Sequence, residues 1–346
     1  MTVSVAISQD VAVYIDAVGK IVAREVVSIQ PQVSGRITQI HFTDGADVKP
    51  GDPLFTIDPR PYQAQLQQAE ANLAQAEAAL SLAKSSFARV ESVSDPRAVS
   101  RQDYDTKKIA VEGADALVKQ SRAALENARL NLDYCTIRAP INGRAGQRAV
   151  DVGNVVAANG ASLLIVQRLD PVYADFTVTE NDLTAVQRNM ARRSLRVEVR
   201  LPDEIADARE GKLTFLDNSV QDGTGTVKLR ATLTNSDRRF WPGRFAKVRL
   251  VLDTRRDAVL IPAEAPQLSA KGPFVYVIKS DSSAELRPVK LGQRQSDSVV
   301  IEEGVKAGEQ VVVKGQLGVT PGGKVRIAQP ADGSNAPAKT KAATQP

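Results

Sequence analysis

The sequence predicts a mainly β fold that carries a long α-helical coiled-coil hairpin, in an elongated chain of several domains. Three observations predict this fold class. A β-type motif occurs twice, the residues between its copies have heptad spacing, and the remaining sequence alternates short apolar runs with turn residues. With 346 residues, the chain also exceeds the length that one hydrophobic core usually serves.

The two copies of the β-type motif stand at a constant offset. SIQPQVSGRI begins at Ser28 and TIRAPINGRA at Thr136, and this offset of 108 residues (136 − 28) continues without a gap. Because so short a motif cannot bury a face alone, we expect the copies to pair into one small sandwich. The matched residues are Ile29 and Ile137, Val33 and Ile141, Gly35 and Gly143, Arg36 and Arg144, Gly45 and Gly153, Val48 and Val156, Phe55 and Leu163, and Ile57 and Ile165.

The residues between the copies predict two helices in an antiparallel coiled coil. In both arms, apolar and small residues recur at alternating spacings of three and four, over about four heptads. The outgoing positions are Tyr62, Leu66, Ala69, Leu73, Ala76, Leu80, Ala83, Phe87 and Val90, and the returning positions are Val111, Ala114, Val118, Ser121, Leu125, Ala128 and Leu132.

The ends of these two helices also carry sequence signals. Pro61 fits the first turn of the outgoing helix, and Ser100 with Asp103 resembles an N-cap followed by an acidic third residue. Between the arms, Pro96 disfavours helix at Asp95. We therefore expect a turn in the SDPR segment.

The rest of the chain predicts two further β-units and a tail. LDPVYADFTVTENDLTAVQRNM predicts a strand and then a helix capped at Thr179 or Asn181, and segments such as LRVEVRLP and RFAKVRLVL have the spacing of a barrel. We expect DVAVYIDAVGKIV to complete that sheet. A third β-unit runs from about Ala258 to Ile327, and TVSVAI is expected to pair with it. The final QPADGSNAPAKTKAATQP predicts disorder.

Composition argues against several classes of function. The net charge of +5 comes from 45 basic and 40 acidic residues, a mixture that does not predict a nucleic-acid partner. His41 and Cys135 are the only residues of their kinds, so a multi-histidine metal site is excluded and a Cys/His pair is not expected. Cys135 is expected to be a small buried hydrophobe. We expect no catalytic residue, no metal site and no cofactor, and hence no enzyme.

Two features leave alternatives open. Five arginines, Arg188, Arg192, Arg193, Arg196 and Arg200, form either a solvated face or a contact to lipid headgroups or an acidic partner. No stretch approaches the roughly 18 apolar residues of a membrane span, and residues 1–20 lack the pattern of a signal peptide. Either the protein is cytosolic, or its targeting segment is missing from this sequence.

Several segments together resemble a known family. The two halves of the repeat resemble lipoyl domain halves interrupted by a coiled-coil hairpin, and LDPVYADFTV, FWPGRFAKVRLVL, VLIPAEA and VIEEGVKAGEQVVVKGQL follow in the family's order. The chain is similar in this way to the periplasmic adaptors, or membrane fusion proteins, of tripartite resistance-nodulation-division (RND) efflux pumps. The similarity extends from about residue 3 to residue 328.

The sequence patterns and the resemblance together predict a division into five parts. They are 1–9 with 257–328 as a membrane-proximal β-domain, 10–25 with 167–256 as a β-barrel domain, 26–60 with 134–166 as a lipoyl-like sandwich, 61–133 as the α-helical hairpin, and 329–346 as a disordered tail.

The resemblance also implies partners and a location. An inner-membrane RND transporter and an outer-membrane channel protein would bind the adaptor, which would assemble with itself as a homohexamer. The location would be the periplasm, with the full-length protein attached peripherally to the inner membrane. Members usually begin with a lipidated or membrane-anchoring segment, which we expect to be missing from this sequence.

The family's channel-docking hairpins carry Arg, three residues, Leu, six residues and Ser at the tip. Arg89, Val93 and Ser100 stand at that spacing, with Val in place of Leu. The resemblance therefore implies that these three residues bind the outer-membrane channel. The alternative interpretation is that they are ordinary seam and cap residues.

Other functions compete with an RND adaptor. One is an adaptor of an ATP-driven exporter or a type I secretion system. Another is a lipoyl or biotinyl carrier, although the hairpin replaces the turn in which such carriers hold their modified lysine, and Lys49 lies in a different turn. A purely structural coiled-coil scaffold would explain the hairpin but not the three β-units.

Overall fold

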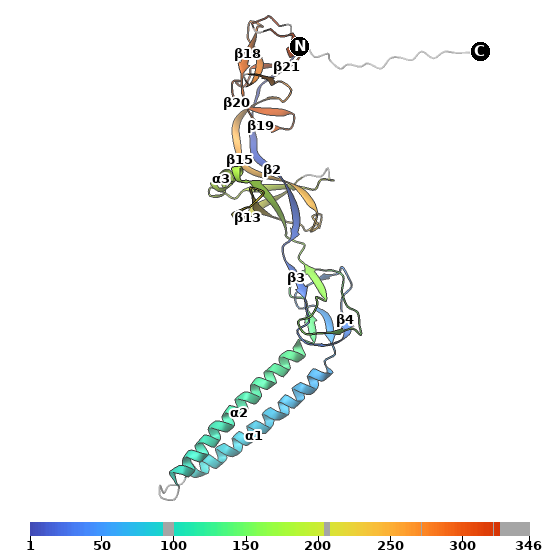
Figure 1. Ribbon diagram of the computed structural model, residues 1–346, viewed down its shortest axis with the longest axis vertical. Helices are drawn as coiled ribbons and strands as arrows, with labels where there is room; N and C mark the ends of the chain where they lie inside the picture. Colours follow the sequence, from blue (N-terminus) through green and yellow to red (C-terminus); the bar gives the residue numbers. More distant parts are fainter. Residues whose placement is uncertain (93–99, 204–207, 271, 321, 326–346) are drawn as a thin grey trace, which may run out of the picture. The chain divides into compact units, whose positions relative to one another are not determined.

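The computed structural model describes most of the chain (Figure 1), namely residues 1–92, 100–203, 208–270, 272–320 and 322–325. The predicted SDPR turn, Val93 and the predicted tail 329–346 lie outside the described residues. The chain divides into two compact units, one made of Met1–Val18, Phe176–Leu229 and Lys247–Pro346, and the other of Gly19–Asp175 and Arg230–Ala246.

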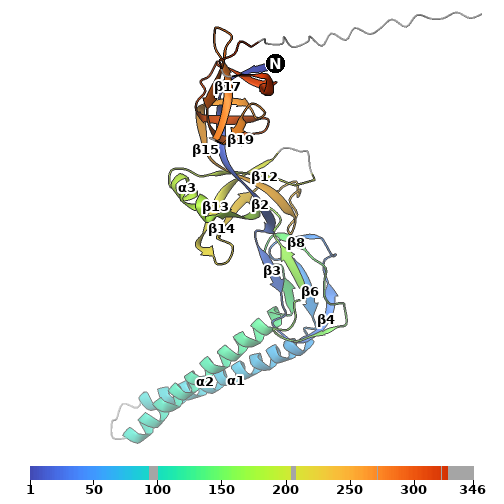
Figure 2. The same cartoon turned by 45° about the horizontal axis from the view of Figure 1, so that its top comes forward.

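The predicted helical hairpin is present. Helices α1 (Arg60–Glu91) and α2 (Arg101–Asp133) lie side by side (Figures 1 and 2). At 1.5 Å per residue, each helix is about 50 Å long. Pro61 stands in the first turn of α1, and Ser100 caps α2 with Asp103 in its first turn, as predicted.

The two helices pack along the predicted heptad positions. Each predicted seam residue is buried or half-buried, whereas most of the residues between them are exposed. Leu125 is 5% exposed and packs in a cluster with Leu66, Ala69, Leu73 and Ala128. A 4-3 pattern of apolar residues thus becomes a continuous apolar contact between the helices.

The two copies of the repeat form a sandwich of two four-stranded sheets. One sheet has the order β3 (Val26–Ile29), β10 (Leu164–Gln167), β8 (Gly143–Ala145) and β5 (Asp47–Val48). The other has the order β7 (Thr136–Arg138), β6 (Pro53–Ile57), β4 (Gly35–Ile40) and β9 (Val155–Val156). Adding the repeat offset to β3 and β5 and subtracting it from β10 and β8 gives the strand order of the other sheet. Each copy therefore contributes two strands to each sheet.

Matched residues of the repeat share structural roles. Gly45 and Gly153 both have a positive φ, of 78° and 99°, which favours glycine. The other matched glycines, Gly35 and Gly143, lie where a Cβ atom would come within 2.5 Å of a neighbouring atom. Most matched apolar residues lie in one common core.

One matched pair differs between the copies. Ile57 is fully buried, whereas Ile165 is 45% exposed. In β10, Leu164 and Val166 point into the core instead. Because side chains alternate along a strand, a shift of one residue moves Ile165 to the outer face.

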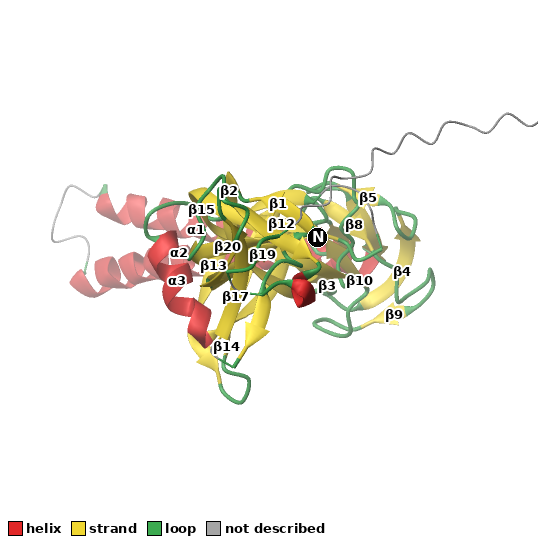
Figure 3. Cartoon of the chain, turned by 90° about the horizontal axis from the view of Figure 1, so that it is seen from above, coloured by secondary structure: helices red, strands yellow, loops and turns green. Residues whose placement is uncertain are grey.

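The predicted barrel belongs to an eight-stranded sheet (Figure 3). An additional pairing between β12 and β15 closes six of the described strands into a ring. Helix α3 (Glu180–Met190) begins after its predicted N-cap Thr179. The strand order is β12 (Arg196–Arg200), β13 (Arg209–Gln221), β14 (Thr226–Leu233), β11 (Val172–Thr179), β2 (Ile7–Ala23), β15 (Phe245–Pro262), β20 (Ser298–Glu303) and β19 (Lys290–Gln295).

The third β-unit contains a five-stranded sheet. Strand β1 (Thr2–Val5) pairs with β21 (Gln310–Lys314), so the expected pairing of TVSVAI is confirmed. The sheet continues through β17 (Gly272–Ile278), which pairs with β16 (Gln267–Ser269) and β18 (Ala284–Pro288), and the short helix η1 is Gln316–Gly318. Strand β15 runs through the predicted domain boundary at 256/257, and the five-part division remains a prediction.

Side-chain amides tie β2 to β19 within one compact unit. The amide of Gln293 accepts a hydrogen bond from Tyr14 N at 3.2 Å and donates one to Tyr14 O at 2.8 Å. Gln295 Nε2 donates to Ala12 O at 2.8 Å. These amides satisfy backbone groups of β2 in the way that a neighbouring strand would.

We expect Leu125→Ala to destabilise the hairpin by about 2–3 kcal/mol, because it leaves a cavity in the seam. Hydrogen exchange of the α2 amides should accelerate more than about tenfold, since each 1.4 kcal/mol corresponds to a factor of ten.

Leu117→Ala is the matched control, because Leu117 lies on the same helix and is 46% exposed. The α2 amides of this variant should exchange at nearly the rate of the unaltered protein. Equal acceleration in both variants would contradict the seam assignment.

Candidate functional site: the helical hairpin

The hairpin is rooted in two neighbouring strands of the sandwich. Strand β6 leads into α1 and α2 leads into β7, and these strands pair with Phe55 opposite Ile137 and Thr56 opposite Thr136. In addition, the hydroxyl of Tyr62 donates to the backbone oxygen of Ser34 at 2.7 Å. The start and the end of the hairpin are therefore held by one sheet.

An acidic residue holds the first turn of α1. Asp58 accepts a hydrogen bond from the backbone N of Arg60 at 3.2 Å, and its carboxylate oxygens accept from Arg60 Nε at 2.9 Å and Nη2 at 2.6 Å. These bonds lower the pKa of Asp58 to about 2. A carboxylate with a depressed pKa contributes its stabilisation above its ordinary pKa of 3.8 and loses it as the pH falls towards 2. The root of the hairpin thus keeps this contact at neutral and mildly acidic pH.

The far ends of α1 and α2 contact each other through aromatic rings. The ring centroids of Phe87 and Tyr104 lie 5.2 Å apart. Helix α1 ends at Glu91 and α2 begins at Arg101, so Arg89 and Ser100 lie at the same end of the hairpin.

Arg89 and Ser100 are both exposed, but they differ in their contacts. Arg89 donates to the hydroxyl oxygens of Ser85 at 3.3 Å and Ser86 at 3.1 Å on its own helix, and it lies in the last turn of α1. There a cation is favoured by the helix dipole. The hydroxyl oxygen of Ser100 accepts from Gln102 N at 3.2 Å. Ser100 is therefore an N-cap, and a binding role would be additional to that structural role.

The three predicted docking residues are thus placed only in part. Arg89 and Ser100 come to one end of the hairpin, and Val93 lies outside the described residues. Across 61–133 the sequence has nine basic and ten acidic residues, so the hairpin has almost no net charge. Recognition by the hairpin would depend on individual side chains and surface shape rather than on a charged groove.

The sequence prediction missed a second apolar row on α2. Ile109 is 65% exposed and Leu130 is 49% exposed, and both lie off the seam. Ala116 and Ala123 lie between them at intervals of seven residues. The seven-residue spacing could have revealed this row, which lies on the outer face of the coiled coil.

The chain's single cysteine and single histidine both lie outside the hairpin. Cys135, at its base, is buried, and burial raises the pKa of its thiol to about 11. No group of at least three His, Cys, Asp or Glu residues that could hold a metal ion occurs among the described residues. His41 is exposed, and its Nε2 lies 2.8 Å from the hydroxyl of Thr56.

Lys49 does not occupy the position that a carrier would require. It follows β5, and its backbone N donates to the Asp52 carboxylate at 2.8 Å in an exposed turn. The connection between the two halves of the repeat is the hairpin, which leaves β6 and returns to β7.

Three matches to described protein families cover most of the chain. Residues 25–168 match the description "RND MFP, barrel-sandwich hybrid domain", in which MFP denotes membrane fusion protein. Residues 171–254 match "RND MFPs, beta-barrel domain", and residues 257–316 match "RND MFPs, C-terminal permuted SH3 domain".

Individual proteins are similar over nearly the same length. The chain is 35% identical over 324 residues to the Multidrug resistance protein MdtA of Pantoea ananatis, covering 93% of this chain and 79% of that protein. It is 34% identical over 327 residues to MdtA of Salmonella paratyphi C, covering 94% and 79%. The crystal structure of MacA from Actinobacillus actinomycetemcomitans has a TM-score of 0.65 and 21% identity, covering 91% of this chain and 99% of that chain. At this identity, the likeness to MacA concerns the fold.

Ser100→Ala should weaken the start of α2 by about 1 kcal/mol, because the first turn loses its side-chain hydrogen-bond acceptor. Ser100→Asp should keep the cap, since aspartate caps helices as well as serine does. Hydrogen exchange at Gln102 and Asp103 measures the difference. Equal protection in the Ala and Asp variants would show that the hydroxyl does not cap the helix.

Cys135 should resist thiol reagents at pH 8 in the folded protein, because a thiol with a pKa of about 11 is almost entirely protonated there. Its reaction with 5,5′-dithiobis(2-nitrobenzoic acid) should become fast in guanidinium chloride. Rapid reaction of the folded protein would contradict the buried position.

Proposed function

The chain belongs to the RND membrane fusion proteins, and from this premise we propose that it is the periplasmic adaptor of a multidrug efflux pump. The relatives at 34–35% identity carry the name "Multidrug resistance protein", which supports drugs as the exported class. In this role the protein connects other subunits and encloses the exit path. It does not transform the exported compound.

The hairpin carries the proposal for the outer-membrane partner. The hairpin is a coiled coil about 50 Å long that begins and ends at two paired strands. At its far end the side chains of Arg89 and Ser100 are exposed. We propose that Arg89, Val93 and Ser100 bind an outer-membrane channel protein. The side chain of Val93 is apolar like the family's leucine, but shorter.

An inner-membrane RND transporter is the proposed second partner. The match of residues 171–254 and 257–316 to the two further RND membrane fusion domains supports this pairing. An ATP-driven exporter or a type I secretion system is the competing assignment, and the transporter that co-purifies with the full-length protein decides between them.

Self-association is part of the same proposal. We propose a homohexamer, in which neighbouring hairpins lie side by side. The exposed row of Ile109, Ala116, Ala123 and Leu130 supports a contact on the outer face of α2, because it offers small and apolar side chains at a heptad interval.

The proposed location is the periplasm, with the full-length protein attached to the inner membrane. None of the described helices has the length and apolar character needed to span a bilayer. Fractionation of cells that express the full-length gene tests the location directly.

Arg89→Ala should weaken channel binding roughly tenfold or more, because buried arginines in interfaces often contribute 2 kcal/mol or more. Resistance and cross-linking to the channel should fall, while transporter co-purification and the helical circular dichroism signal stay unchanged. Ser100→Asp removes the hydroxyl but keeps the helix cap, so it tests whether the hydroxyl itself binds the channel. This variant should also reduce cross-linking.

Arg129→Ala is the matched control, because Arg129 is an exposed arginine of α2 that pairs with Glu126, at 2.9 Å, within its own helix. Cross-linking should survive this change. If Arg89→Ala and Ser100→Asp both cross-link like the unaltered protein, the proposed docking residues are wrong.

A further inference from the structure

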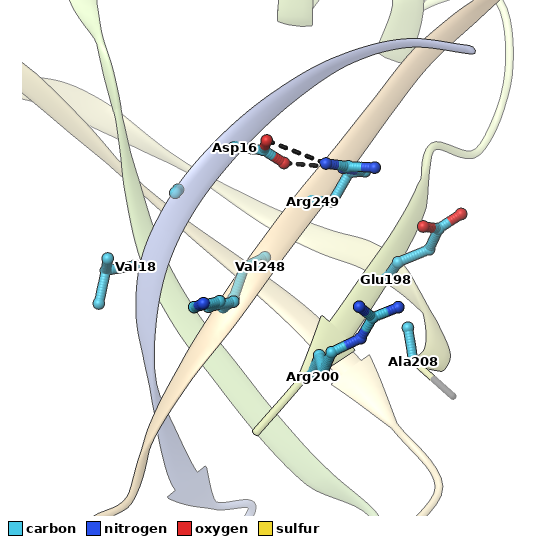
Figure 4. A pocket seen from close by; sticks show the side chains of 9 residues that line it. Asp16, Val18, Glu198, Arg200, Ala208, Val248 and Arg249 are labelled. Atoms are coloured by element: carbon cyan, nitrogen blue, oxygen red, sulfur yellow. Dashed lines mark hydrogen bonds and ion pairs between the residues drawn. The ribbon is translucent and has the colours of Figure 1, made fainter. Parts of the chain in front are cut away.

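A cavity of about 430 Å³ lies on the barrel strands (Figure 4). Its lining belongs to one compact unit. Strand β2 contributes Asp16, Ala17 and Val18, β12 contributes Glu198 and Arg200, β15 contributes Lys247, Val248 and Arg249, and Ala208 completes the wall. This volume lies within the range of small-molecule sites, roughly 300–1,000 Å³.

One of the three cationic side chains that line the cavity already has an ion-pair partner. Arg249 donates to both carboxylate oxygens of Asp16, at 2.8 and 3.0 Å, as the dashed lines in Figure 4 show. Its guanidinium carbon also lies 3.6 Å from the centroid of the Tyr14 ring. Glu198 is engaged as well, in an ion pair with Arg196 at 3.2 Å.

The other two cations, Arg200 and Lys247, are neighbours on adjacent strands. Arg200 and Lys247 lie directly opposite each other in the β12–β15 register. Among the described residues, neither has an ion-pair partner. Like charges directly opposite on neighbouring strands destabilise a sheet, so this pair carries an energetic penalty that a bound anion would remove.

The remaining wall is apolar. Ala17, Val18 and Ala208 line the cavity beside the cation pair, and Val18 is 70% exposed, whereas the lining residue Val248 is itself only 1% exposed. An exposed valine beside two cations that have no ion-pair partner among the described residues suits a ligand that has an apolar body as well as a negative charge.

We propose that this cavity is a binding site for a small amphiphilic anion, a carboxylate, sulfate or sulfonate attached to an apolar body. Arg200 and Lys247 bind the anionic group, and the two alanines and Val18 contact the body. The site is independent of the hairpin and of the proposed efflux role. Binding lowers the repulsion between the two cations and thereby stabilises the protein.

The probes are 8-anilinonaphthalene-1-sulfonate and decyl sulfate below its micellar concentration. Titration with the fluorescent probe should give saturable binding that decyl sulfate displaces and that inorganic sulfate at the same ionic strength does not. Affinity should fall as salt rises, since salt screens exposed charges.

Charge and volume are tested by separate variants. Arg200→Gln combined with Lys247→Gln should weaken binding about tenfold or more, because it removes two charge-assisted contacts. Ala208→Phe should reduce binding to a similar extent by filling the cavity without changing the charge. Arg256→Gln is the matched control, because Arg256 is an exposed residue of the same strand outside the cavity.

A thermal melt provides a second readout. Without any probe, the melting temperature of the double Gln variant should equal or exceed that of the unaltered protein. Decyl sulfate should raise the melting temperature of the unaltered protein but not that of the variant. The proposal is overturned if both cavity variants bind the probe like Arg256→Gln, or if inorganic sulfate displaces the probe as well as decyl sulfate does.

Discussion

The architecture of this chain depends on the interleaved pairing of two short β-motifs. Neither copy of the repeat can bury a face by itself, and the structure solves this by giving each sheet two strands from each copy. The shared core, which includes Phe55 and Leu163 at matched positions, forms only when both copies are present. Everything between the copies must therefore leave the sandwich and return to it, and α1 and α2 do so through the paired strands β6 and β7.

Periodic patterns made much of the fold predictable from the sequence. The heptads predicted the seam because burial in a coiled coil recurs at the same interval as the apolar residues, and Ser100 was predicted as a cap because capping is local. The repeat showed which residues are equivalent but not which strands pair. Ile165 illustrates the limit, because the offset matched it to the buried Ile57 whereas strand alternation exposes it.

The candidate sites were less accessible to sequence reasoning. The spacing of Arg89 and Ser100 predicted a shared end of the hairpin, and the structure adds that Ser100 already has a capping role. The opposition of Arg200 and Lys247 depends on the register of β12 and β15, which are not consecutive in the chain. No local pattern reports such a register. The proposed channel contact and the proposed anion site thus differ in origin, the first coming from spacing and family and the second from strand pairing and the cavity beside it.

The root of the hairpin has a consequence for its length. Because α1 and α2 enter and leave through neighbouring strands, the coiled coil stands in place of a turn between β6 and β7. Adding or removing one heptad in each arm preserves the seam and leaves the strand register untouched, while the far end moves by about 10 Å. The length of the hairpin can therefore change in steps of one heptad during evolution. The same sandwich can then carry hairpins that contact partners at different distances.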